Sequence, residues 1–246
     1  MNAIRLNKAL AMAGICSRRR ADELISAGAV TVNGQSCTEL GLRVDPTSDI
    51  VSVHGKVVSF PTEEDRHCYL MLHKPIQVVC TAKDPEGRPT VLDYLPAKYR
   101  QARLYPVGRL DYFSEGLLIL TDDGELTNRM THPSHHLPKT YEVLLRERPQ
   151  SAMLEAMRNG MTLAEGERLA PVETRYDPDR KTLVLILRQG INRQIRRMCR
   201  DFGLTILRLQ RVAIGPLSLG SLPKGECRPL HENEVAALKK ATGLTA

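Results

Sequence analysis

Residues 108–126 read GRLDYFSEGLLILTDDGEL, a stretch that places a carboxylate shortly before a strong strand signal. The apolar run GLLIL predicts a buried strand. Asp111 precedes this run and lies two residues after Arg109. Two interpretations are open: a polar turn that leads into the strand, or a carboxylate that reacts with a substrate. The rest of the chain has to decide between them.

The length and the apolar pattern restrict the class of protein. The chain has 246 residues, enough for one large domain or for a small module joined to a catalytic domain. No apolar stretch approaches the roughly 18 residues that a membrane span needs. The N-terminal residues also lack the apolar core and cleavage site of a secretory signal. We therefore expect a soluble, cytoplasmic protein without a membrane partner.

The sequence gives no support to a metal or nucleotide cofactor. The six cysteines form no CxxC pair, and His132, His135 and His136 have no cysteine or carboxylate nearby at a usual metal-ligand spacing. The glycine-rich phosphate-binding patterns GxGxxG and GxxxxGK do not occur. We expect reduced thiols, no metal and no cofactor.

Positive charge is concentrated in one segment. The net charge is +7, and residues 188–211 contain seven arginines and a single acid, Asp201. Such clustering predicts a polyanionic partner, although a basic face in contact with solvent would have the same composition. The chain has no tryptophan, seven tyrosines and three phenylalanines, which argues against a broad stacking platform for single strands.

The centre of this basic segment, INRQIRRMCRDFG, predicts a helix with two faces. Asn192 is the expected N-cap and Gly203 the expected C-terminal stop. Two sets of residues repeat at i, i+3, i+4 and i+7, displaced by two positions, which is about 200° around a helix. The apolar set should be buried and the arginine set should form a stripe: Ile195, Met198, Cys199 and Phe202 against Arg193, Arg196, Arg197 and Arg200. Bound phosphates would relieve the repulsion within the stripe; acids elsewhere in the fold are the alternative.

The first sixty residues predict a separate small module. Apolar residues at helical spacing indicate two helices, the second with Ser17 as its N-cap and Gly28 at its end. VTVNGQ predicts a hairpin that turns at Asn33 and Gly34. Three arginines occupy the first turn of the second helix, where cations oppose the helix dipole: Arg18, Arg19 and Arg20. They suggest phosphate contact, with a solvated helix start as the alternative.

A polar linker at residues 61–67 precedes a larger, strand-rich domain. Its apolar runs are short: YLML, QVVCT, GLLIL, YEVLL, TLVLIL and LTILRL. Helical patterns are fewer and do not alternate regularly with these runs: TVLDYL, GELTNRM, QSAMLEAMRNG and INRQIRRMCRDFG. The pattern favours an α+β fold with a mixed or antiparallel sheet over a doubly wound parallel sheet.

Three motifs in this order resemble those of bacterial ribosomal RNA pseudouridine synthases: GRLDYFSEGLLILTDDGEL, KTYEV and GINRQIRRM. The resemblance is to the branch with an N-terminal RNA-binding module of the alpha-L type, found in ribosomal small-subunit protein four. HKP at 73–75, DPEGRPTVLDYLP and RVAIGPLSLGSLPKGECRPL are similar to the same branch, so the resemblance covers nearly the whole chain. It implies an alpha-L module at residues 1–62 and a pseudouridine synthase catalytic domain at residues 67–246.

The resemblance also implies roles for individual residues. Asp111 matches the catalytic aspartate, Arg196 the basic residue that pairs with it, and Tyr141 the tyrosine that stacks on the target uracil and is a candidate for later proton removal. Arg109 matches the motif arginine that helps to hold the flipped-out nucleotide, and Lys139 fits a phosphate or base contact in the same pocket. Further substrate-binding residues are expected at Lys74, Asn192, Arg193, Gln194 and Arg197, and RNA-binding residues of the module at Arg5, Lys8, Ser17, Arg18, Arg19, Arg20 and Asn33. Two positions depart from the family pattern: Ile191, where Arg or Lys is common, and His73, where Asn is common.

The chemistry of uridine isomerisation suits these residues. The reaction breaks the bond from the ribose to a ring nitrogen and forms a bond from the ribose to a ring carbon. No redox step occurs, so no cofactor is needed. The target base has to leave its stack. An ionised carboxylate, which a nearby arginine favours, can act as nucleophile or proton acceptor. The point of attack stays open between ring carbon 6, the anomeric carbon and the ribose 2′ proton.

We therefore expect conversion of a uridine to pseudouridine in ribosomal RNA. Large-subunit RNA is the expected target because QGINRQIRRMC is closer to members that act there. The alternatives are small-subunit RNA and a non-catalytic RNA-binding assembly factor. A hydrolase with Asp111 as general base is a third, and it lacks the second carboxylate that glycoside hydrolysis usually requires. The expected partners are ribosomal RNA or ribosome assembly intermediates, with the protein as a monomer.

Overall fold

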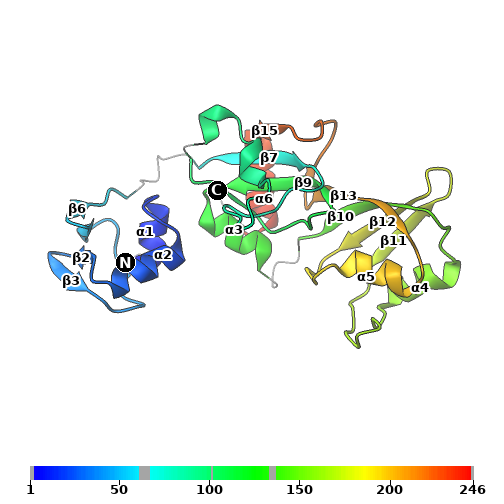
Figure 1. Cartoon of the computed structure of the whole chain (residues 1–246), viewed down its shortest axis with the longest axis horizontal. Coiled ribbons are helices and arrows are strands. Elements are labelled where there is room, and N and C mark those ends of the chain that lie inside the picture. Colours follow the sequence, from blue (N-terminus) through cyan, green and yellow to red (C-terminus); the bar gives the residue numbers. More distant parts are fainter. Residues whose placement is uncertain (1–2, 61–66, 101, 133–136, 245–246) are drawn as a thin grey trace. The chain divides into compact units, whose positions relative to one another are not determined.

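The computed structural model describes residues 3–60, 67–100, 102–132 and 137–244 (Figure 1). By its internal contacts the chain divides into two compact units, residues 1–67 and residues 68–246, each with its own core. Within the described residues, no helix is both long enough and apolar enough to cross a bilayer.

The first unit packs two helices and two small antiparallel sheets around one apolar core. The predicted cap is confirmed, because the Ser17 hydroxyl accepts a hydrogen bond from the Arg20 amide at 3.2 Å. The predicted hairpin is confirmed as well, since Asn33 and Gly34 both have positive φ between two paired strands. The elements are β1 (Ile4–Arg5), α1 (Leu6–Met12), α2 (Arg18–Ser26), β2 (Val30–Val32), β3 (Gln35–Cys37), β4 (Arg43–Val44), β5 (Val51–Val53) and β6 (Lys56–Val57).

In the described part of the second unit the strands form one nine-stranded mixed sheet, which confirms the predicted class. The pairing of β13 with β9 is parallel and short, whereas the neighbouring pairings of β10 with β13 and β7 with β9 are antiparallel. The main strand order is β11 (Glu173–Asp177), β12 (Thr182–Leu187), β10 (Lys139–Leu145), β13 (Ile206–Ile214), β9 (Glu115–Thr121), β7 (Tyr69–Lys74) and β15 (Cys227–Pro229). Two short strands extend it, β8 (Tyr105–Pro106) beside β9 and β14 (Leu217–Ser218) beside β13.

The helices of the second unit are α3 (Gly124–Thr131), α4 (Ser151–Asn159), α5 (Gln194–Asp201) and α6 (Glu232–Ala241). TVLDYL forms a short 3₁₀ helix, η1 (Val91–Tyr94), and a second one, η2 (Ala97–Tyr99), follows it. The prediction of a strand at QVVCT is wrong. Gln77 has a φ of +62°, and Val79 forms only an isolated bridge with Thr90. The apolar character of this run has another cause, because Val78 is buried in the core against η1.

Strand β9, which contains the GLLIL run predicted as a buried strand, is buried from end to end because both faces of the sheet are covered there. Leu117 and Ile119 face the core that includes α3 and α6. Leu118 and Leu120 alternate with them and face the core that includes η1. The loop that carries Asp111 therefore leads into one of the most enclosed strands of the domain.

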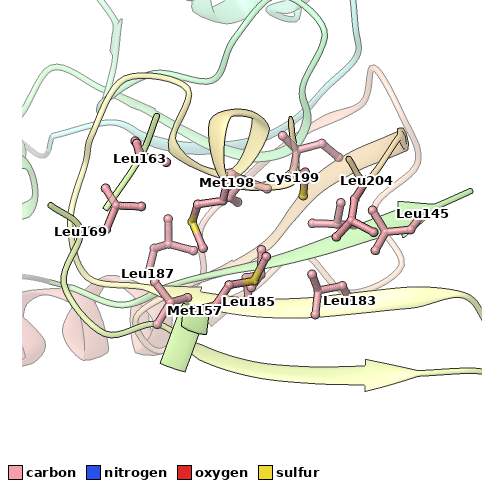
Figure 2. Packing of buried hydrophobic residues seen from close by; sticks show 14 residues of the cluster. Leu145, Met157, Leu163, Leu169, Leu183, Leu185, Leu187, Met198, Cys199 and Leu204 are labelled. Carbon is pink, nitrogen blue, oxygen red and sulfur yellow. The ribbon is translucent and has the colours of Figure 1, made fainter. Parts of the chain in front are cut away.

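Helix α5 is fixed to the sheet by the apolar face that the sequence predicted. Met198 and Cys199 are fully buried in a core shared with β10, β12 and α4. Figure 2 shows these side chains over Leu185 and Leu187 of β12, with Met157 of α4 in the same cluster. This packing determines the direction in which the arginines of α5 point.

Gly116 marks the place where β9 meets β13. Its φ is +112°, and a Cβ atom there would overlap the backbone of Arg211. We expect Gly116→Ala to lower the free energy of unfolding by more than about 3 kcal/mol, through strain and displacement of the strand. Gly166→Ala is the matched control, since Gly166 has a φ of +88° and open space around it; it should cost about 1–2 kcal/mol. Urea unfolding of both variants measures the difference, and equal losses would contradict the close approach of the two strands.

Candidate active site

Asp111 lies in a loop held by hydrogen bonds to its backbone. The amide of Ser114 donates to the Asp111 carbonyl at 3.0 Å, and the amide of Gln77 donates to the Tyr112 carbonyl at 2.6 Å. The Leu110 amide donates to Sγ of Cys80 at 3.3 Å. The Asp111 side chain retains 28% of its exposure. The carboxylate is thus accessible, while the backbone that carries it is fixed.

Lys74 has a different position from the one that the sequence predicted. Instead of reaching the substrate, its ammonium is fully buried and donates to three backbone carbonyls, those of Pro75, Asp111 and Ser114, at 2.9, 3.1 and 2.8 Å. Burial lowers the pKa of Lys74 to about 8. Lys74 therefore ties the end of β7 to both ends of the Asp111 loop, which corrects the expected substrate contact.

This buried lysine has a consequence for stability against pH. The folded-state pKa lies below the unfolded value of about 10.4, so between pH 8 and pH 10.4 the unfolded chain binds more protons. The contribution of Lys74 to stability therefore rises with pH in this window. Relative to Lys74→Met, wild-type protein should gain about 2 kcal/mol in free energy of unfolding between pH 8 and pH 10.4. Denaturant titrations at both pH values measure this, with the exposed Lys83→Met as control; a constant difference would contradict it.

Arg196 connects helix α5 to the same loop. Its Nε lies 3.8 Å from Oδ2 of Asp111, and its Nη2 donates to the Phe113 carbonyl at 2.7 Å and to the Ser114 hydroxyl at 3.2 Å. Burial lowers the pKa of Arg196, an effect that the Asp111 carboxylate opposes. The expected neighbours Asp111 and Arg196 are therefore brought together as an ion pair, with the guanidinium oriented by the loop backbone.

A cleft of about 610 Å³ lies between the Asp111 loop, β10, β13 and the start of α5, and Asp111 is one of its lining residues. Most of the residues expected at the substrate line it: Arg109, Asp111, Lys139, Tyr141, Asn192, Arg193, Gln194 and Arg196. Ile191, one of the two departures, also lines it and packs on the core of α5. The other departure, His73, is buried outside the lining, where its ring contacts the Leu222 carbonyl at 2.7 Å and the Gln210 amide at 3.2 Å.

The cleft contains a buried cation that the sequence analysis missed. Arg211 on β13 lies opposite Tyr141 in the strand register and donates to the carbonyls of Leu117 at 2.8 Å and Arg109 at 3.4 Å. In the sequence, Arg211 lies in an ordinary strand pattern, so nothing except its place in the basic segment 188–211 indicated that it lines the cleft. Burial, and secondarily Arg211, lowers the pKa of Lys139. Among the described lining residues Asp111 is the one carboxylate, so the cleft suits an anionic ligand.

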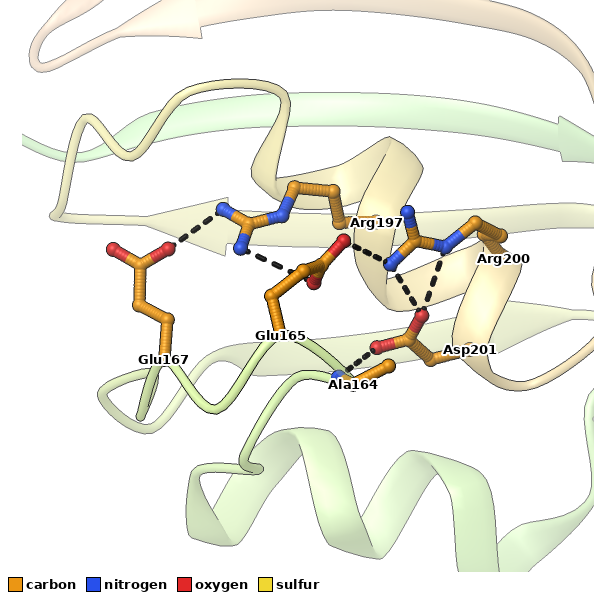
Figure 3. A network of polar contacts seen from close by, with 6 residues as sticks. All are labelled: Ala164, Glu165, Glu167, Arg197, Arg200 and Asp201. Carbon is orange, nitrogen blue, oxygen red and sulfur yellow. Dashed lines mark hydrogen bonds and ion pairs between the residues drawn. The ribbon is translucent and has the colours of Figure 1, made fainter.

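The predicted arginine stripe of α5 is only partly available to a ligand (Figure 3). Arg197 pairs with Glu165 and Glu167 at 3.2 and 2.6 Å, and Arg200 pairs with Asp201 and Glu165. For these two arginines the alternative of acids elsewhere in the fold is correct. Arg197 therefore binds the loop after α4 instead of lining the cleft, because that loop brings its carboxylates over the helix.

Helix α5 begins one residue later than predicted and ends as predicted. Arg193, with a φ of +50°, is the N-cap residue in place of Asn192. Gly203 follows the C-cap with a φ of +68°, as a helix stop should. The left-handed backbone at Arg193 places its exposed side chain at the cleft, although the next two residues, Gln194 and Ile195, are buried.

In the first unit, two expected RNA-binding residues serve the local fold instead. Ser17 caps α2, and the Asn33 side chain contacts Asp49 and the Ile50 amide, each at 2.9 Å. Arg20 pairs with Glu23 at 2.6 Å. Arg5, Arg18 and Arg19 are exposed, and Lys8 is half-buried.

The described residues contain no cluster of His, Cys, Asp and Glu that could hold a metal ion. His135 and His136, considered in the sequence analysis, lie outside the described residues. The six cysteines are free thiols in the structure, and burial raises the pKa of Cys199 to about 12.

Comparison with known proteins adds to this geometry. A family model described as RNA pseudouridylate synthase matches residues 68–201, and one described as S4 domain matches residues 4–51. An uncharacterized RNA pseudouridine synthase of Aquifex aeolicus (strain VF5) is 40% identical over 249 residues, covering 99% of this chain and 97% of the relative. The ribosomal large subunit pseudouridine synthase B of Bacillus subtilis (strain 168) is 39% identical over 240 residues, covering 96% and 95%. The crystal structure of a pseudouridylate synthase aligns with a TM-score of 0.67 at 29% identity, over 96% of this chain and 99% of that chain.

Proposed function

The chain belongs to the RNA pseudouridylate synthase family, and we propose that it converts one uridine of large-subunit ribosomal RNA to pseudouridine with Asp111 as the catalytic residue. The observation that carries the proposal is the accessible Asp111 carboxylate, 3.8 Å from Arg196, as the one acid among the described residues of a cationic cleft. The target subunit is proposed from the likeness to the large-subunit synthase of Bacillus subtilis.

In the proposed reaction the bond between C1′ and N1 breaks and a bond between C1′ and C5 forms. The proton on C5 is released and N1 gains a proton, so the product is an isomer and no oxidant or cofactor takes part. Asp111 reacts as nucleophile or base, and Tyr141 stacks on the uracil and later removes the proton. Arg196 pairs with the Asp111 carboxylate and orients it. Arg109, Lys139, Asn192, Arg193 and Gln194 bind the flipped-out nucleotide and its phosphates.

The released C5 proton gives a direct test. An unmodified large-subunit RNA transcript carrying tritium at C5 of uracil should lose one tritium to water per RNA, with the uracil retained in the chain. A small-subunit transcript should lose none. Binding without tritium release would favour the assembly factor, and release of free uracil would favour the hydrolase.

We further propose a division of labour between the module of residues 1–62 and the catalytic domain of residues 67–246. On this view the protein acts as a monomer in the cytoplasm, on ribosomal RNA or on ribosome assembly intermediates. The module supplies affinity through exposed cations, and affinity should fall steeply with salt because bound phosphates release counterions.

Arg18 and Arg19 make this division measurable. Replacing both with alanine should weaken binding to the large-subunit transcript about tenfold and reduce the salt slope by about two. The kcat should be unchanged. Arg20→Ala is the control, because Arg20 is already paired with Glu23. A loss of kcat in the double variant, with KM unchanged, would count against the division.

A further inference from the structure

Phe113 is an apolar side chain that the fold leaves uncovered beside the active site. It is 55% exposed, whereas the other two phenylalanines, Phe60 and Phe202, are half-buried against apolar cores. It lies two residues after Asp111 and one before Ser114, both of which line the cleft. An exposed phenylalanine contributes little to folding, and its place beside the cleft leaves its ring available to a bound ligand.

The backbone around Phe113 is unusually well fixed for a loop with an exposed tip. The Phe113 carbonyl accepts from Arg196 at 2.7 Å, and the preceding Tyr112 carbonyl accepts from the Gln77 amide at 2.6 Å. Lys74 holds the carbonyls of Asp111 and Ser114 on either side. The ring of Tyr112 meets that of Phe113 edge to face, with centroids 5.0 Å apart. The backbone that carries the Phe113 ring is therefore fixed before any ligand binds, and Tyr112 supports one edge of the ring.

A base-flipping reaction creates a surface that such a ring can cover. When the target uridine leaves its stack, the adjacent base loses its stacking partner, and proteins often place an apolar side chain in that gap. Aromatic rings stack on bases of any sequence. Because Asp111 has to reach the flipped nucleotide, a side chain two residues along the same loop lies close to the RNA that this nucleotide leaves.

We propose that Phe113 stacks on the base next to the flipped uridine and holds the RNA open during the reaction. The inference rests on the proposed function and adds a positioning residue to it. Ile76 is also exposed, and it directly precedes Gln77, whose amide binds this loop. The expected partner is structured RNA, because an RNA strand whose bases are not stacked has no gap for the Phe113 ring to fill when the uridine flips out.

The test uses the full-length protein and the large-subunit transcript, together with a hairpin cut around the uridine that wild-type protein modifies. Phe113→Ala should lower kcat/KM on both RNAs about tenfold, and Phe113→Tyr should retain wild-type values because the ring remains. Leu207→Ala is the matched control, since Leu207 is 53% exposed in the same unit; it should leave kcat/KM unchanged. Thermal unfolding should be unchanged in all three variants.

Two further readouts separate stacking from a general RNA contact. A 2-aminopurine beside the target uridine should brighten less with Phe113→Ala than with wild-type protein. On an unstructured oligonucleotide of the same sequence, the tenfold difference should disappear. Two results would overturn the role of Phe113 while leaving the proposed function standing. One is Phe113→Ala activity equal to that of Leu207→Ala. The other is an equal loss of activity on the structured RNAs and on the unstructured oligonucleotide. A wild-type protein that forms no pseudouridine would remove both.

Discussion

Asp111→Asn should reduce pseudouridine formation by at least about 10⁴-fold, because an amide can neither act as a nucleophile nor accept a proton. The substitution preserves the shape of the side chain, and the loop keeps its hydrogen bonds from Lys74 and Arg196. RNA affinity should stay the same or increase, since a negative charge is removed from a cationic cleft. Single-turnover tritium release measures the chemical step, and filter binding at fixed salt measures affinity.

Asp179→Asn is the control for Asp111→Asn, since Asp179 is exposed in the turn between β11 and β12. It should retain wild-type activity and affinity. Full activity of Asp111→Asn would contradict the assignment of the catalytic residue. A large loss of affinity, with turnover of bound RNA unaffected, would instead make Asp111 a binding residue.

Arg196→Ala should have the second-largest effect, a fall in kcat of about 10²–10³-fold with less than about tenfold loss of affinity. The variant removes the cation 3.8 Å from Asp111 and the donor to the Phe113 carbonyl, so the carboxylate loses both its ion pair and the contact that orients its loop. Rapid-quench kinetics at saturating RNA separate this loss from a change in binding.

Arg197→Ala provides a closely matched control. Arg197 is the next residue on α5, and its side chain has the same exposure as that of Arg196, 19%. Its partners are Glu165 and Glu167 instead of Asp111. The kcat should therefore change by less than about threefold, with a modest loss of stability. Equal losses of kcat and affinity in both variants would mean that Arg196 is simply one member of a phosphate-binding stripe.

The comparison of these neighbouring arginines also shows where sequence reasoning succeeds. The spacing of Ile195, Met198 and Cys199 correctly predicted the buried face of α5. It could not predict the partners of Arg197, because Glu165 and Glu167 come from a loop about thirty residues earlier that returns over the helix. A face with many arginines has the same sequence pattern whether phosphates or carboxylates neutralise it.

Lys74 illustrates a second limit. A lysine at the end of a strand beside a catalytic motif is expected to contact an anion, yet this ammonium is buried among backbone carbonyls. Those carbonyls belong to loops that come together only in the tertiary fold, so nothing local reveals them. Helix α6 was not predicted for a different reason: its capping box begins with His231 instead of the usual Ser or Thr, and Glu234 completes it.

The central claim is tested most directly by carbodiimide-based mapping of pseudouridine in total ribosomal RNA. RNA would be taken from cells with the intact gene, without the gene, and with the Asp111→Asn form. We expect one stop in large-subunit RNA that is present with the intact gene and absent from both altered strains. A stop pattern that is identical in all three strains would contradict an Asp111-dependent uridine isomerase that acts on ribosomal RNA.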